Sequence, residues 1–132
     1  MKAIAAKHHS GVTHLSIVKC DDNSGAKTLK VIAQMGFKGT KKRRPTIGVG
    51  DVFKASVIKG KPAMRKKIVK CVLIRQKHEY RRRTGDRVKF DENAAVLITD
   101  KNEPVGSEIK GAVAKEIAER FPRISTIAKN VI

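Results

Sequence analysis

The stretch CVLIRQKHEYRRRTGDRVKF, from Cys71 to Phe90, joins an apolar run directly to a dense group of positive charges. The sixteen positions from Arg75 to Phe90 contain seven Arg and Lys residues. A disordered basic tail would lack the apolar surface that is needed to offset the loss of chain entropy. Because this segment begins in apolar sequence and ends at Phe90, it predicts a folded scaffold that carries charge on a projecting loop or β-ribbon.

Short apolar runs of strand type surround this stretch. In the run 52–58, Phe53, Ala55 and Val57 share one face of an extended chain, and Lys54 and Ser56 share the other. Asp, Asn, Ser and Gly in 21–25 predict a turn that makes a hairpin of the first two runs. Several short strands at regular spacing indicate a small barrel or sandwich. The expected strands are 15–20, 29–35, 52–58 and 68–74, and residues 88–90 with 94–99 supply one or two more.

The pattern changes after the loop from Asp100 to Pro104. Apolar residues then recur at every fourth position, which predicts a helix of period 3.6 that ends before Pro122. Apolar residues within 124–128 allow one further short turn or helix. The residues that form the apolar stripe are Ile109, Val113, Ile117 and Phe121.

The length of 132 residues suits a single domain with an aliphatic core, since the chain has no Trp, one Tyr and four Phe. We expect Cys20 and Cys71 to be buried reduced thiols, because they form no Cys-x-x-Cys pair and no secretory signal precedes them. No apolar run is long enough to span a membrane. The chain is therefore expected in the cytoplasm.

The positive charge is concentrated in one region. The chain has 30 basic and 12 acidic residues, a net charge of +18, and residues 38–89 hold 19 of the basic and three of the acidic ones, a net +16. One basic run alone would be read as a solvated surface, but three runs in 52 residues favour a polyanionic partner. The guanidinium groups of the Arg residues beside Tyr80 and His78 suit phosphates and unstacked bases of RNA. They are less suited to reading the base sequence in a groove of DNA. The predicted RNA-binding residues are Lys41, Lys42, Arg43, Arg44, Lys59, Lys61, Arg65, Lys66, Lys67, Arg75, Lys77, Arg81, Arg82, Arg83, Arg87 and Lys89.

Other chemistry has weaker support. His8, His9 and His14 lack a nearby Cys or acid to complete a metal site, and Asp21 and Asp22 are expected to form hydrogen bonds of their own turn. The glycines at 36–41 and 48–50 lack the spacing of phosphate-binding and dinucleotide-binding loops. We therefore expect no catalytic residue, no metal and no cofactor. A nucleic-acid-processing enzyme and a free-standing, histone-like packaging protein remain as alternative classes.

Several segments together resemble the universal large-subunit ribosomal protein fourteen family over residues 14–132. Departures at Cys71, Thr84 and Ala112, with the extension through Thr13, are similar to its archaeal and eukaryotic branch. The matching segments are 22–26, 48–51, 72–75, Gly85, 90–91, 93–94, 96–97, Pro104, Gly106, Ile109, Gly111 and Val113.

This resemblance implies a five-stranded β-barrel with a projecting β-ribbon and short carboxy-terminal helices. One domain is expected, with an extension at 1–13, the barrel and basic loops at about 14–100, and a helical segment at about 101–132. The family implies a non-enzymatic constituent of the large subunit that binds its rRNA and meets small-subunit rRNA at an intersubunit bridge. It also implies contact with ribosomal protein three and, through the segment from Lys101, with an anti-association factor.

Overall fold

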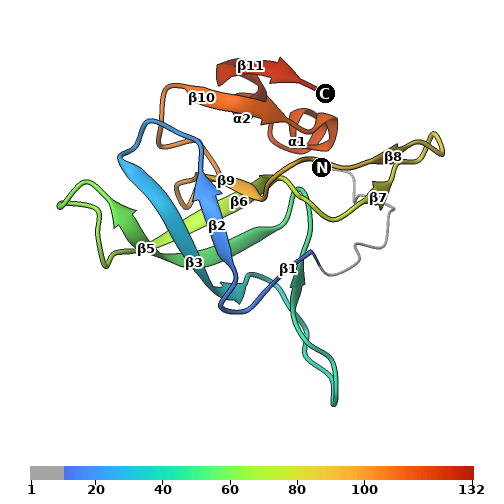
Figure 1. The fold of residues 1–132 in the computed structure, drawn as a ribbon, viewed down its shortest axis with the longest axis horizontal. Helices are drawn as coiled ribbons and strands as arrows, with labels where there is room; N and C mark the ends of the chain where they lie inside the picture. Colours follow the sequence, from blue (N-terminus) through green and yellow to red (C-terminus); the bar gives the residue numbers. More distant parts are fainter. Residues whose placement is uncertain (1–10) are drawn as a thin grey trace.

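The computed structural model describes residues 11–132 and contains a closed barrel of five strands (Figure 1). Neighbouring strands follow the order β2-β3-β5-β6-β9, and β2 pairs with β9 in parallel to close the barrel. The other four pairings are antiparallel. The five-stranded barrel is therefore confirmed. Its strands are β2 (Ile17–Cys20), β3 (Ala26–Gln34), β5 (Val52–Gly60), β6 (Ile68–Arg75) and β9 (Ala94–Leu97).

The buried cluster inside the barrel is mostly aliphatic and includes the ring of Phe53. Phe53, Ala55 and Val57 point inward from β5 and are buried, whereas Lys54 is exposed. This alternation confirms the predicted face of the strand, because side chains of a strand point to opposite sides in turn. Leu29 of β3 also belongs to this interior cluster.

Residues 71–74 of strand β6 are buried on both faces of the strand. Cys71 and Leu73 point into the barrel, while Val72 and Ile74 pack in a second apolar cluster outside it. Both apolar faces are covered, so the run 71–74 reads as continuously apolar rather than alternating. Cys71, like Cys20, is a buried free thiol, as the sequence predicted, and burial raises the pKa of each.

The carboxy-terminal unit covers the outer face of β6 and β9 (Figure 1). It consists of β10 (Ile109–Val113), α1 (Lys115–Arg120), α2 (Pro122–Ile127) and β11 (Ala128–Val131), with β10 and β11 paired in parallel. Ile117 of α1 and Ile124 of α2 are fully buried against the barrel wall. The unit thus supplies the second half of the core.

The prediction of a helix beginning at Ile109 was wrong, because residues 109–113 form a strand. Ile109 and Val113 are both buried, as expected from the apolar stripe. A spacing of four places two residues on one face of a helix and also on one face of a strand, so these residues alone could not distinguish the two. Helix α1 begins after Ala114, and α2 begins at Pro122, whose fixed φ suits a first helical position.

A short pairing of β1 (Val12–Thr13) with β4 (Thr46–Ile47) holds the amino-terminal end of the described chain against the barrel. Val12 and Ile47 belong to the interior cluster. No helix within residues 11–132 has the length and apolar character needed to cross a membrane.

Candidate RNA-binding surface

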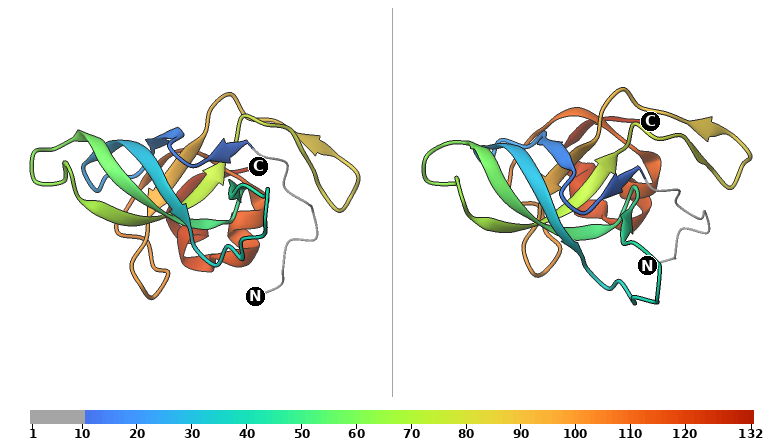
Figure 2. Two further views of the ribbon diagram at one scale, coloured as in Figure 1. Left: turned by 90° about the horizontal axis from the view of Figure 1, so that it is seen from below. Right: turned by 60° about the horizontal axis from the view of Figure 1, so that its bottom comes forward.

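The predicted cations lie mainly on three projections from the barrel (Figures 1 and 2). These are the β3–β4 loop (residues 35–45), the β5–β6 loop (residues 61–67), and the β7–β8 ribbon, in which β7 (Tyr80–Arg81) pairs with β8 (Arg87–Val88). The two views in Figure 2 show the projections leaving the barrel at separate places. The structure therefore distributes the cations around the molecule rather than gathering them in one patch.

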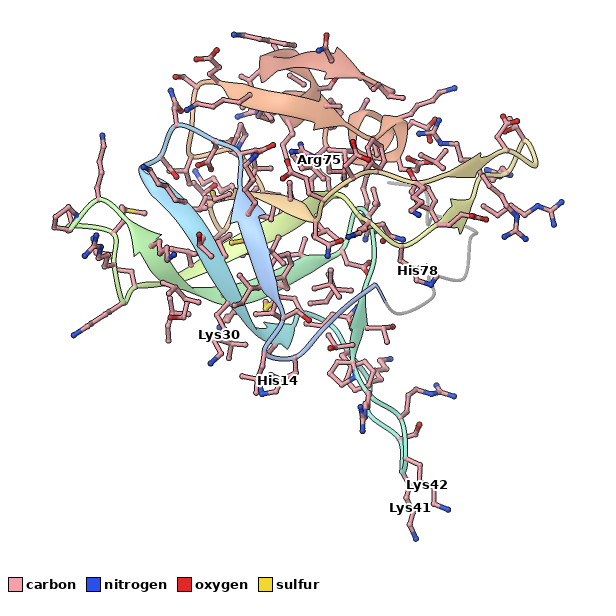
Figure 3. All side chains as sticks on the ribbon, viewed as in Figure 1. His14, Lys30, Lys41, Lys42, Arg75 and His78 are labelled. Carbon is pink, nitrogen blue, oxygen red and sulfur yellow. The ribbon has the colours of Figure 1, made fainter. Side chains whose placement is uncertain are left out.

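The β3–β4 loop carries the first basic cluster at its tip. Lys42 has a φ of +66°, and the amide of Arg43 donates to the carbonyl of Thr40 at 3.1 Å, so the tip is a tight turn. Figure 3 shows Lys41 and Lys42 pointing away from the barrel. All four cations are exposed, and none forms an ion pair within residues 11–132: Lys41, Lys42, Arg43 and Arg44.

The β5–β6 loop carries the second cluster on a backbone fixed by main-chain hydrogen bonds. The amide of Lys61 donates to Gly25 O at 2.9 Å, and that of Lys66 donates to Val57 O at 3.0 Å. The side chain of Arg65 folds back, with Nε 3.0 Å from Gly60 O. The predicted cations in and beside this loop are all exposed: Lys59, Lys61, Arg65, Lys66 and Lys67.

The β7–β8 ribbon carries the third cluster around a turn at Gly85. Gly85 has a φ of +99°, a conformation that glycine adopts without steric cost, and its amide donates to Arg82 O at 3.0 Å. Arg87 is exposed and pairs with Glu79 at 2.6 Å, which lowers the pKa of that carboxyl. Also exposed on or beside the ribbon are Lys77, Arg81, Arg83 and Lys89.

Arg82 holds the ribbon against the carboxy-terminal unit. Its Nε donates to Glu116 Oε1 at 2.8 Å, and its Nη2 donates to Ile132 O at 2.6 Å. The hydroxyl of Tyr80 donates to the other oxygen of Glu116 at 2.9 Å. We call Tyr80, Arg82 and Glu116 the ribbon clamp. No local pattern marks Glu116 as a partner, because it lies 34 positions from Arg82.

Tyr80 is not available to stack on RNA bases, so that expectation was wrong. The residue is only 5% exposed, and burial raises the pKa of its hydroxyl. A buried Tyr is favourable here because its hydroxyl finds a partner in Glu116. His78 is exposed, and its Nδ1 lies 2.9 Å from Glu79 O.

Removing the charge of Glu116 is expected to loosen the ribbon. Glu116→Gln should lower the free energy of unfolding by about 1.5–3 kcal/mol, the usual contribution of hydrogen bonds to charged groups. It should also speed amide hydrogen exchange in residues 80–88. Glu119→Gln is the matched control, because Glu119 is exposed on the same helix. Equal exchange rates in the two variants would contradict the clamp.

Arg75 lies inside the molecule and is bound on several sides (Figure 3). Its Nη2 pairs with Asp21 and Glu92, and its Nη1 donates to Ala112 O at 3.0 Å. We assign Arg75 a structural role, because an arginine that is 6% exposed and paired with carboxylates offers no fork to phosphate.

The two neighbouring aspartates have different roles. Asp22 accepts from the amide of Ser24 at 3.2 Å, which confirms its place in the turn, and also from the amide of Leu97 at 2.9 Å. Asp21 instead forms the buried pair with Arg75, so its prediction as a turn residue was wrong.

Metal-ligating residues do not gather in the described part of the chain: residues 11–132 contain no group of three His, Cys, Asp or Glu that could hold an ion. His14 Nδ1 lies 2.5 Å from Ile32 O. His8 and His9 lie outside the described residues.

Comparison with known proteins identifies the family. The model of ribosomal protein L14p/L23e matches residues 11–132. Similar proteins named large ribosomal subunit protein uL14 include those of Methanocella arvoryzae, 48% identical, Halorubrum lacusprofundi, 47% identical, and Thermoplasma acidophilum, 48% identical. Each alignment spans 132 residues and the whole of both chains. The resemblance predicted from sequence is thereby confirmed: the chain belongs to the ribosomal protein L14p/L23e family.

Proposed function

We propose that the three projections bind large-subunit rRNA and that the chain also meets small-subunit rRNA at an intersubunit bridge. As a member of the L14p/L23e family, the chain is a structural constituent of the large subunit in the cytoplasmic ribosome, not an enzyme. The RNA contacts and the bridge go beyond family membership and rest on the arrangement of charge.

The observation that carries the proposal is the exposure of the predicted cations on a rigid scaffold. Of the sixteen, fourteen are exposed, although two of these, Arg65 and Arg87, also contact other residues of the chain. Arg75 is buried and Arg82 is partly buried, and both pair with carboxylates. Main-chain hydrogen bonds order the β5–β6 loop and the β7–β8 ribbon before RNA arrives, which lowers the entropy cost of binding. Neutralising the clustered cations with phosphates releases counterions and relieves their mutual repulsion.

The proposal includes protein partners. We infer contacts with neighbouring ribosomal proteins, among them ribosomal protein three, and with an anti-association factor at the segment from Lys101 onward. Exposed apolar side chains at Val105, Val131 and Ile132 support a protein contact at this segment, because they provide apolar area that a partner can cover.

RNA binding by the ribbon is tested by replacing Arg81 and Arg83, while Arg82 is kept so that the ribbon clamp stays intact. Arg81→Ala/Arg83→Ala should weaken binding to protein-free large-subunit rRNA and lower the slope of log affinity against log salt by about 2, since each phosphate contact contributes about 0.9. Stability should be unchanged, because both side chains are exposed. Filter binding between 50 and 200 mM salt (roughly the range in which such slopes are measured) gives the slope.

Lys54→Ala/Lys101→Ala is the control with the same change of charge, because both lysines are exposed and lie outside the projections. Equal slopes for the two double variants would contradict binding by the ribbon. Co-sedimentation of the wild-type chain with large subunits through a high-salt sucrose gradient is the second expected result. Equal affinity for duplex DNA together with absence from that fraction would indicate a packaging protein instead.

A further inference from the structure

A pocket of about 580 Å³ lies where the 21–25 turn, β10 and the base of the β5–β6 loop meet. Its volume falls within the range of roughly 300–1,000 Å³ that is usual for ligand sites. The buried residues Asp21, Asp22 and Arg75 line its inner part. Four exposed lysines from separate parts of the chain also line it: Lys19, Lys27, Lys61 and Lys110.

Two glycines allow side chains of the pocket to lie close to the backbone. Gly25 has a φ of +102°, and a Cβ at this position would come within 3.0 Å of Lys61 Cδ, so the glycine leaves room for the lysine side chain. The amide of Lys110 donates to Asp21 O at 3.0 Å, and this bond fixes β10 at the pocket's edge. A Cβ at Gly111 would overlap the side chains of Arg75 and Asp21.

The acidic groups of the pocket already have partners. Lys19 lies 3.0 Å from Glu92 and 3.5 Å from Asp21, and Arg75 pairs with both of these carboxylates. Asp22 accepts hydrogen bonds from the amides of Ser24 and Leu97. Without the remaining lysines, the pocket has two cations against three carboxylates, a net charge of −1.

Three further lysines bring additional positive charge to the pocket, although Lys110 also lies near Glu108, whose pKa is lowered by Lys129 and by Lys110. Lys27, Lys61 and Lys110 form no ion pair within residues 11–132. Together with the paired residues they give the pocket five cations against three carboxylates, a net charge of +2. Like charges held around one cavity repel one another, and an anion that enters the cavity relieves that repulsion.

We propose that this pocket binds backbone phosphates of rRNA and that Lys27 and Lys110 are RNA-binding residues. The inference rests on the proposed binding of rRNA, and it adds a contact that lies outside the three projections. Lys61 belongs to both the pocket and the β5–β6 loop, so one RNA strand that follows the loop reaches the pocket without a break. A phosphodiester chain suits a site with several separate lysines, because each lysine acts as a mobile point charge.

The variant Lys27→Ala/Lys110→Ala tests the pocket and leaves every residue of the projections in place. We expect about 50-fold weaker binding to protein-free large-subunit rRNA at 0.1 M salt and a salt slope lower by about 2, from about 0.9 per phosphate contact. Lys54→Ala/Lys101→Ala again supplies the control with the same change of charge. An effect no larger than that of the control would overturn the proposal that the pocket binds RNA.

Lysine acetylation of the wild-type chain gives a second test that needs no variant. Binding of the rRNA should protect Lys27 and Lys110 more strongly than Lys54, as measured by mass spectrometry. Inorganic phosphate, at the same concentration of phosphate groups, should leave all three reactive. Equal protection by inorganic phosphate would mean that a free ion is the ligand, and no added protection by rRNA would also overturn the assignment.

These outcomes separate the pocket from the proposed function. If Arg81→Ala/Arg83→Ala weakens RNA binding but Lys27→Ala/Lys110→Ala behaves as the control, the pocket proposal fails alone. If the wild-type chain does not bind the rRNA, both proposals fail.

Discussion

Replacing Arg75 by methionine is expected to lower the free energy of unfolding by about 3–5 kcal/mol, the usual cost of removing one partner from a buried ion pair. The guanidinium is 6% exposed, and Asp21, which it pairs with, is 3% exposed. Without Arg75, the ion pair left to Asp21 within residues 11–132 is the one with Lys19 at 3.5 Å, so a carboxylate stays buried with too little compensation. The bond from Arg75 to Ala112 O is lost as well, which loosens β10 on the barrel.

The double variant Asp21→Asn/Arg75→Met provides the matched control. Because both charges are removed together, it should recover most of the lost stability, since neutral groups can replace a buried ion pair at little cost. Urea denaturation of the wild type, both single variants and the double variant gives the coupling energy. Simple addition of the two single effects would show that the pair does not act as a unit.

The dependence of stability on acid pH should also change in the single variant Arg75→Met. Hydrogen bonds from Arg75 and Lys19 lower the pKa of Glu92, so the unfolded chain takes up this proton first as the pH falls. The stabilisation is present above the ordinary Glu value of about 4.3 and is lost below it, as the pH passes through the folded-state pKa. Arg75→Met should weaken this dependence. An identical pH profile would contradict the role of Arg75.

Replacing all four cations at the tip of the β3–β4 loop by alanine is expected to give the largest loss of RNA binding. At about 0.9 per phosphate contact, the salt slope should fall by about 3–4 and the affinity at 0.1 M salt by about three decades. The fold should be preserved, because these side chains are exposed and form no ion pair in residues 11–132. The replaced residues are Lys41, Lys42, Arg43 and Arg44.

The control for this variant removes four exposed lysines from outside the projections and the pocket. Filter binding to large-subunit rRNA across a salt series measures both variants, and thermal unfolding checks that each is folded. Similar slopes would show that the loop acts only through the net charge of the chain, and its assignment as an RNA contact would be withdrawn. The control lysines are Lys30, Lys54, Lys101 and Lys115.

Local sequence was sufficient for the barrel strands and for the place of the charge. The alternation in β5, the turn at 21–25 and the basic loops depend on neighbouring residues, so they could be predicted. The helix expected from Ile109 failed because its spacing fits strand and helix alike. Arg75 stands at the head of a basic run, and nothing in that run marks it as the residue turned inward.

The sequence by itself determined that a small apolar barrel would form and that most of the positive charge would lie on connections between its strands. Only the tertiary structure decided which cations are used internally, because Arg75 finds Asp21 and Arg82 finds Glu116 through contacts between distant segments. The same holds for the pocket, where barrel closure and the packing of β10 bring Lys27 and Lys110 together. Such pairings depend on barrel closure and on the docking of the carboxy-terminal unit, which bring together residues that lie far apart in the sequence.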